Sequence, residues 1–164
     1  MTSDAELPDV GEVLSRVLMI VAREQQPLLV AVAERMAAER YRDWARVSPD
    51  AQQRDALLAC AGREDDIARR IESLYPGAAA LQQQMIDQNP DLAEINRSLF
   101  AARSLPQQFT IQARGERLGA ATWRAFAAHA QHAAARDTFL TCANLEEESA
   151  IVLEGFIAKS GDAA

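Results

Sequence analysis

Four glutamates are the residues of this sequence whose type and spacing could carry out chemistry. Each interrupts an otherwise apolar stripe along a predicted helix, and they are Glu34, Glu64, Glu116 and Glu146. In the helix expected over 50–74, for example, Leu57 and Ile71 recur on the face that also holds Glu64. A carboxylate in such a stripe is desolvated and repels its neighbours, so it needs a cation, a proton or an arginine beside it.

Metal ions are the counter-charge that the sequence favours. No arginine lies three or four residues from any of the four glutamates, which are the spacings that share a helix face. Arg35 and Arg117 directly follow two of them and lie about 100° further round the helix. An all-oxygen site favours manganese, magnesium or iron over zinc or copper, so we expect a pair of iron or manganese ions between the carboxylates.

A turn at 48–50 sets the height of the first two glutamates. Ser48 is expected to cap the following helix, with Pro49 at its first position. Glu34 and Glu64 are equally distant from Pro49 in sequence, which places both about 20 Å from the turn in an antiparallel hairpin. Glu116 and Glu146 are equally distant from Gln131 in sequence, so they are predicted to stand level in the second hairpin for the same reason. All four carboxylates are therefore predicted to converge on one layer.

The sequence also repeats itself at an offset of 82 positions, half of its 164 residues. Segment 34–72 aligns without a gap on 116–154, and both copies hold Glu-Arg, Arg-Asp and Cys-Ala pairs in the same order. Such a match in register indicates internal duplication. We expect a single domain over 1–164, built from repeats 1–82 and 83–164 that each contribute a helical hairpin.

The hydrophobic periodicity predicts an all-α fold. Short helices are expected over 9–24 and 91–103, and long ones over 27–47, 50–74, 107–130 and 133–158, followed by a polar tail. Pro27 and Pro106 mark the breaks after the short helices. The tract 76–106 is long enough to run along a bundle, so we expect one four-helix bundle of two hairpins with a crossover, plus short accessory helices.

Composition and charge exclude several classes of partner. Apolar residues make up 49% of the chain, aromatic residues only 5%, and the net charge is −7. Such an acidic protein is repelled by phosphate backbones and anionic lipid, so no nucleic acid and no membrane is expected as a partner. Residues 1–8 have no basic and apolar leader, and no run of 18 apolar residues occurs. We expect a cytoplasmic location.

The arrangement of these residues resembles that of ferritin and rubrerythrin. Glu34-x6-Tyr41, then Glu64 in the middle of the next helix, with the pair repeated after a crossover, is similar to the ferritin-like superfamily. The resemblance covers about 27–74 and 107–158. It implies that a dimetal centre is held by the four carboxylates, Glu34, Glu64, Glu116 and Glu146.

The family pattern has two Glu-x-x-His motifs, and both histidines are replaced in this sequence. Ile67 and Ser149 stand where the motifs place histidine. His129 and His132 fall near a predicted turn, too far along the helix from the glutamates to substitute for them. The predicted metal centre therefore has no nitrogen ligand.

Each of the other residues beside the predicted layer has two possible interpretations. Cys60 and Cys142 precede a glutamate by one turn, and they are either small buried hydrophobes or a thiol pair that ligates metal or forms a disulfide. Tyr41 is interpreted as core packing, with a hydrogen bond to Glu34 as its further role. Glu147 fits either a solvated face or an extra ligand.

Two functions are consistent with these features. The first is a ferritin-like protein that binds a metal pair and handles iron or manganese, or performs oxidase-type chemistry, with no catalytic residue assigned. The second is a degenerate, metal-free ferritin-like bundle that acts as an interaction module or homo-oligomer. A tRNA-modifying hydroxylase on this scaffold is disfavoured by the acidic charge and the missing histidines.

Overall fold

The computed structural model describes residues 6–161, and over this range the chain is helical, which confirms the all-α prediction. The elements in chain order are α1 (Val10–Leu18), the 3₁₀ helix η1 (Arg23–Gln25), α2 (Gln26–Val47), α3 (Ala51–Glu72), α4 (Ala78–Gln88), α5 (Leu92–Phe100), α6 (Leu105–Ala128) and α7 (Ala133–Gly161). No strand occurs among these residues.

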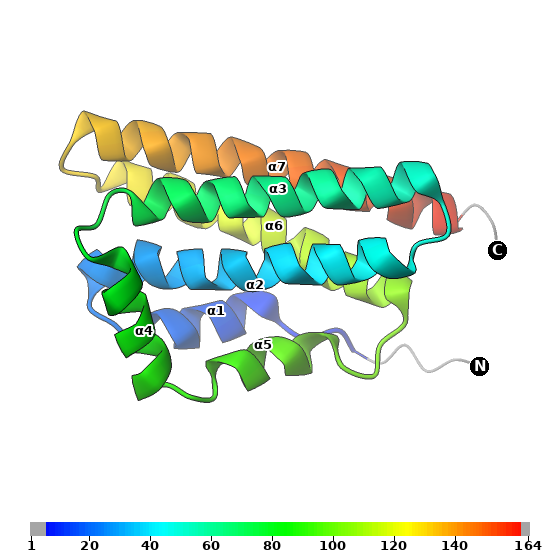
Figure 1. Ribbon diagram of the computed structural model, residues 1–164, viewed down its shortest axis with the longest axis horizontal. Helices are drawn as coiled ribbons and strands as arrows, with labels where there is room; N and C mark the ends of the chain where they lie inside the picture. Colours follow the sequence, from blue (N-terminus) through cyan, green and yellow to red (C-terminus); the bar gives the residue numbers. More distant parts are fainter. Residues whose placement is uncertain (1–5, 162–164) are drawn as a thin grey trace.

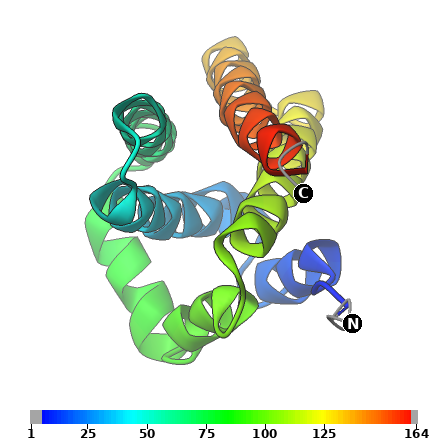
Figure 2. The ribbon, with the colours of Figure 1, turned by 90° about the vertical axis from the view of Figure 1, so that its right-hand side faces the viewer.

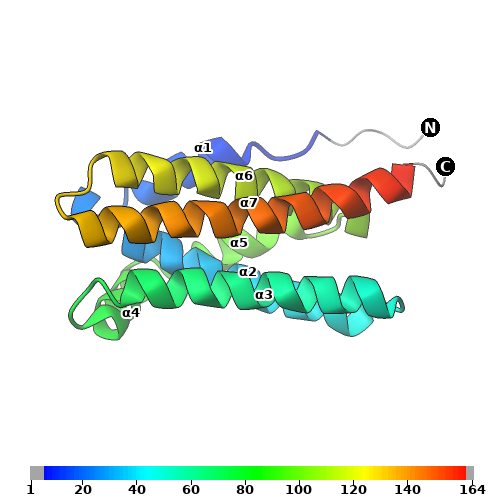
Figure 3. The ribbon, with the colours of Figure 1, turned by 90° about the horizontal axis from the view of Figure 1, so that it is seen from above.

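Four long helices run along the molecule as two antiparallel hairpins (Figure 1). Helices α2 and α3 form one hairpin, α6 and α7 form the other, and α3 packs against α7 where the hairpins meet (Figure 3). The shorter α1 and α5 lie on the α2–α6 side, while α4 crosses the end of the molecule between α3 and α5 (Figure 2). Each of the four long helices therefore faces a shared interior.

Local capping explains where three helices begin. Asp9 accepts a hydrogen bond from the backbone N–H of Glu12 at the start of α1. Ser104 and Gln107 form a reciprocal capping box at the start of α6. The predicted cap of α3 was wrong, because Asp50 rather than Ser48 accepts the bond from the Gln53 N–H, and the helix begins at Ala51.

Helix α4 was not anticipated from the sequence. It follows Gly77, whose φ of 70° is readily adopted by glycine and reverses the chain after α3. Its Met85 packs with Leu28 and Leu29 of α2 and with Leu92 in a small apolar cluster. At the repeat offset its counterpart would begin near residue 160, so the duplicated pattern carried no signal for it.

The expected ends of two other helices also differ. Helix α1 stops at Leu18 instead of continuing to 24, and the Gln26 side chain donates to the Leu18 carbonyl there. Helix α7 continues to Gly161, through most of the predicted polar tail. Residues 162–164 of that tail lie outside the described residues, as do residues 1–5 of the predicted leaderless N-terminus and first repeat.

Two apolar clusters fill the interior between the long helices. The first is built around Trp123 and Phe139, whose rings stack with centroids 5.9 Å apart, and includes Ile67, Ile71 and Cys142. The second is built around Tyr41, Trp44 and Phe109 and includes Leu57, Cys60 and Leu153. Each cluster draws residues from all four long helices, and the glutamates lie between the two.

Equivalent ion pairs lie on the two hairpins. Arg35 contacts Glu72 at 2.7 Å, and Arg117 contacts Glu154 at 2.8 Å, with both partners offset by 82 positions. These contacts aim both arginines along the outside of their hairpins. Neither arginine forms an ion pair with a glutamate of the layer within the described residues, and the division into repeats 1–82 and 83–164 stays a prediction.

Candidate metal centre

The four predicted glutamates are all buried, one on each long helix. Their exposed fractions are 7% for Glu34, 0% for Glu64, 1% for Glu116 and 2% for Glu146. Carboxylate oxygens of Glu34, Glu64 and Glu146 all lie within 4.8 Å of one another. The structure thus brings three of the four predicted ligands into one group and leaves Glu116 beside it.

Glu116 is held by two donors on the same oxygen. The Tyr41 hydroxyl donates to its Oε1 at 2.6 Å, and the Gln112 side-chain amide donates to the same atom at 2.7 Å. We had expected Tyr41 to bond to Glu34 on its own helix. It donates instead to Glu116 on the facing helix. The Oε2 atom of Glu116 is buried and has no hydrogen-bond partner among the described residues.

Glu64 accepts a hydrogen bond from Ser149, which stands at a position where the resemblance to ferritin-like proteins predicted histidine. The Ser149 hydroxyl donates to Oε1 of Glu64 at 3.1 Å, and the guanidinium of Arg63 donates to that hydroxyl at 3.0 Å. The serine thus supplies a hydrogen-bond donor across the interface between the two hairpins. Oε2 of Glu64 is the second buried carboxylate oxygen without a partner in the described part of the chain.

Glu146 depends on a gap left by a glycine. Trp123 donates its indole N–H to Oε1 of Glu146 at 2.9 Å. A Cβ atom built on Gly119 of the neighbouring helix would lie only 2.5 Å from the same oxygen. Ala37 occupies the equivalent position in the first hairpin. A glycine inside a predicted helix, where the other repeat has alanine, was the sequence signal for this close approach.

Two arginines lie closer to the layer than the sequence suggested. Arg40 donates to the side-chain oxygen of Gln112 at 2.6 Å, and Gln112 in turn donates to Glu116. Arg63 reaches Glu64 through Ser149 in the same manner. No arginine lies at helical spacing from the glutamates on their own helices, and these contacts instead cross between helices.

Burial and mutual repulsion change the acidity of this layer. The pKa of Glu34 rises from 4.5 to about 7, mainly because the carboxyl is buried and secondly because Glu116 lies nearby. Burial, followed by the charge of a neighbouring glutamate, also holds the pKa values of Glu64 and Glu146 well above the ordinary value. Without metal, Glu34, Glu64 and Glu146 therefore release their protons at higher pH than exposed glutamates do.

The two cysteines do not form a pair. Cys60 packs in the Tyr41 cluster and Cys142 in the Trp123 cluster, on opposite sides of the glutamate layer, and both are free thiols. Each cysteine precedes its glutamate by one helical turn. Because α3 and α7 run antiparallel (Figure 3), the two cysteines lie toward opposite ends of the molecule. Burial raises the pKa of Cys142 to about 12 and that of Cys60 in the same direction. They are buried small hydrophobes.

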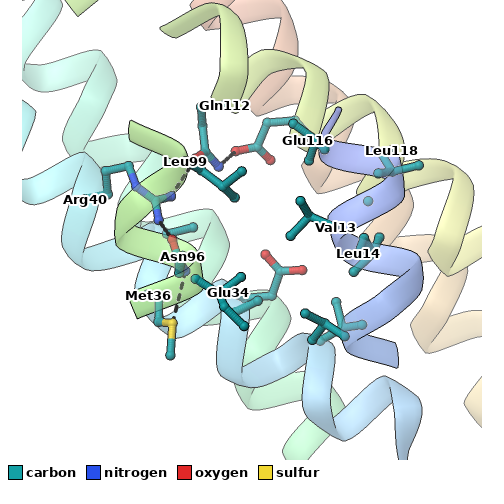
Figure 4. A pocket seen from close by; sticks show the side chains of 18 of the residues that line it. Val13, Leu14, Glu34, Met36, Arg40, Asn96, Leu99, Gln112, Glu116 and Leu118 are labelled. Carbon is teal, nitrogen blue, oxygen red and sulfur yellow. Dashed lines mark hydrogen bonds between the residues drawn. The ribbon is translucent and has the colours of Figure 1, made fainter. Parts of the chain in front are cut away.

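A cavity of about 180 Å³ reaches the layer from the side of α1 and α5. Its wall is largely apolar and comes mainly from α1, α2, α5 and α6, with Val13, Leu14 and Leu99 among its lining residues and Glu146 contributed by α7. The carboxylates of Glu34 and Glu116 face the same space from opposite sides (Figure 4). Access to the layer is therefore one-sided, because α3 and α7 pack directly on the opposite side.

Comparisons with family models, curated proteins and solved structures find no match for this chain. Within residues 6–161, no helix combines the length and the apolar character that crossing a bilayer demands.

Proposed function

We propose that this protein is a ferritin-like bundle that binds iron or manganese in its glutamate layer. Glu34, Glu64 and Glu146 are the primary ligands, and Glu116 is the fourth carboxylate. The observation that carries the proposal is the convergence of three buried carboxylates within 4.8 Å. A divalent cation offsets the repulsion and desolvation that such a group otherwise bears.

Two further observations support a bound cation. Hydrogen-bond donors engage Oε1 of Glu64 and Oε1 of Glu116, while the Oε2 atom of each is buried without a partner. Buried polar atoms are nearly always satisfied, so these two oxygens fit a missing positive ligand. Gly119 also keeps open the space that the Glu146 carboxylate occupies. The donor set is all oxygen, which suits manganese or iron.

The role of the chain's own residues follows from these contacts. Tyr41, Gln112, Trp123 and Ser149 orient carboxylates, as outer hydrogen-bonding partners of metal ligands commonly do. The two apolar clusters exclude water on both sides of the layer. A bound iron or manganese would supply Lewis-acid and redox chemistry.

The alternative is a metal-free interaction module, and the arginine relays favour it. Arg40 and Arg63 each approach one glutamate through a single neutral side chain, which supplies positive potential without a metal. Leu58 and Leu140, at equivalent positions of α3 and α7, are 47% and 42% exposed and offer apolar contacts to a second copy. In this case the layer is held by protons.

Manganese titration followed by calorimetry tests the proposal in protein freed of metal with a chelator. We expect the Glu64→Gln variant to bind manganese at least about tenfold more weakly than the parent, since one ligand charge is removed. Glu148→Gln is the matched control, because Glu148 lies on α7 with its side chain exposed. Equal affinity of Glu64→Gln and the parent, or no binding by the parent at millimolar manganese, would leave the metal-free alternative.

A further inference from the structure

The cavity between α1, α2, α5 and α6 has a polar end and an apolar body. Glu34, Glu116 and Glu146 contribute to its wall, and Arg40 is the cationic residue that lines it. Arg40 is already engaged by Gln112 and by the side chain of Asn96, and its guanidinium lies 3.8 Å from the centroid of the Phe100 ring. It forms no ion pair within residues 6–161. No donor of Arg40 reaches Oε2 of Glu116, which has no partner in the described part of the chain.

We propose that this cavity binds a small aliphatic primary amine, with its ammonium group on the free oxygen of Glu116. Oε2 of Glu116 is buried, unpartnered and part of a side chain that faces the cavity (Figure 4). An ammonium group supplies the three donors and the positive charge that this oxygen and Glu34 lack. A carboxylate head is disfavoured, because it brings neither a hydrogen-bond donor nor a positive charge to this oxygen.

The size of the cavity fixes the length of the apolar body. An engineered protein cavity of 150 Å³ accommodates benzene, so a volume of about 180 Å³ suits an apolar body of about six to eight carbon atoms. Val13, Leu14 and Leu99 supply apolar contacts along this body. The inference extends the proposed metal site toward the cavity, because Glu116 is its fourth carboxylate but lies outside the group of three carboxylates within 4.8 Å.

Titration with n-hexylamine tests the inference in chelator-treated full-length protein, with hexan-1-ol and hexanoate as probes of the same length. Calorimetry and melting curves should show hexylamine binding at least about tenfold more tightly than hexan-1-ol and no binding of hexanoate. Absence of hexylamine binding at millimolar concentration, equal binding of amine and alcohol, or tighter binding of hexanoate would overturn the inference.

Two variants locate the ligand. Glu116→Gln should weaken hexylamine about tenfold and leave hexan-1-ol unchanged, because the charge is lost while the shape is kept. Leu14→Trp should fill the cavity and abolish binding of both probes, while manganese still binds. Hexylamine binding to Leu14→Trp with parental affinity would refute the cavity as its site. Manganese titration of the same samples separates the proposals, since a parent that binds hexylamine but no manganese retains the cavity inference and loses only the metal function.

Discussion

At the scale of single residues, the glutamate layer depends on neighbours that are not themselves acidic. Ser149 donates to one oxygen of Glu64 and Gln112 donates to one oxygen of Glu116, and an arginine donates to each of these two neutral side chains. Such a relay restrains a carboxylate without neutralising it by direct contact. Its other oxygen is left free for a ligand, which is the feature that both proposals use.

Gly119 is the residue whose replacement tests this architecture most sharply. In Gly119→Ala the added methyl would meet the Glu146 carboxylate at 2.5 Å, so this side chain must leave its bond to Trp123. We expect a net loss of about 1–2 kcal/mol of stability, because overpacking outweighs the gain of about 1 kcal/mol in helix propensity. Chemical denaturation measures the change.

Gly62→Ala is the control for that experiment. Gly62 lies within α3, and a Cβ atom built there meets nothing within 4 Å. This variant should be as stable as the parent or more stable by up to about 1 kcal/mol. If Gly119→Ala behaves like Gly62→Ala and keeps parental manganese affinity, Glu146 does not need the space that Gly119 leaves.

At the scale of elements, caps and prolines determine where the long helices begin. Pro27 and Pro106 lie in the first turns of α2 and α6, where a missing backbone N–H costs no helical hydrogen bond. The start of α6 matters most, since this helix carries Gln112, Glu116 and Gly119. Its capping box therefore sets the register of half of the layer's supporting contacts.

Replacing the cap of α6 should be measurable. Ser104→Ala removes the acceptor of the Gln107 N–H, and we expect a loss of about 1 kcal/mol in the free energy of unfolding. Ser160→Ala is the control, because its hydroxyl only donates to the Phe156 carbonyl near the end of α7. Denaturant titration of both variants decides the matter, and equal stability would mean that packing alone fixes the start of α6.

At the scale of the whole molecule, the buried layer links stability to pH. The folded pKa of Glu34 is raised from 4.5 to about 7, so the native state binds more protons than the unfolded state between these values. Stability of the metal-free protein should therefore fall as pH rises through this window. For Glu34 alone the loss amounts to about 3 kcal/mol. Glu64 and Glu146 add to it in the same direction.

Melting curves at pH 5.5 and 7.5, recorded after metal removal, measure this effect. The Glu34→Gln variant should lose less stability than the parent over the same interval, because an amide does not titrate. Carboxyls with lowered pKa, such as those of Glu94 and Glu154 beside arginines, change stability only below their ordinary pKa and do not mask the trend. A parent that gains stability toward pH 7.5 would contradict a crowded layer.

Metal should reverse the loss at high pH. A cation that binds only the native layer adds about 2.7 kcal/mol at one hundred times its dissociation constant. Manganese should accordingly raise the melting temperature more at pH 7.5 than at pH 5.5, where protons compete for the same oxygens. An equal rise in melting temperature at both pH values would indicate that manganese binds elsewhere on this acidic protein.

The sequence by itself determined the helical class, the approximate bounds of the four long helices and the burial of all four glutamates. These follow from local periodicity and from equal distances to each turn, which are properties of one helix or one hairpin. Glu34 and Glu64 are level because α2 and α3 are antiparallel neighbours, and no information about the other hairpin was needed.

Only the tertiary structure decided which side chains meet across hairpins. Tyr41 reaches Glu116 instead of Glu34, Ser149 reaches Glu64, and Arg40 approaches through Gln112, because each contact joins different hairpins or elements. Helix α4 and the cavity beside α1 and α5 likewise depend on how short helices pack on the long ones. Spacing along a chain specifies a helix face, whereas the partner of that face is set by long-range packing.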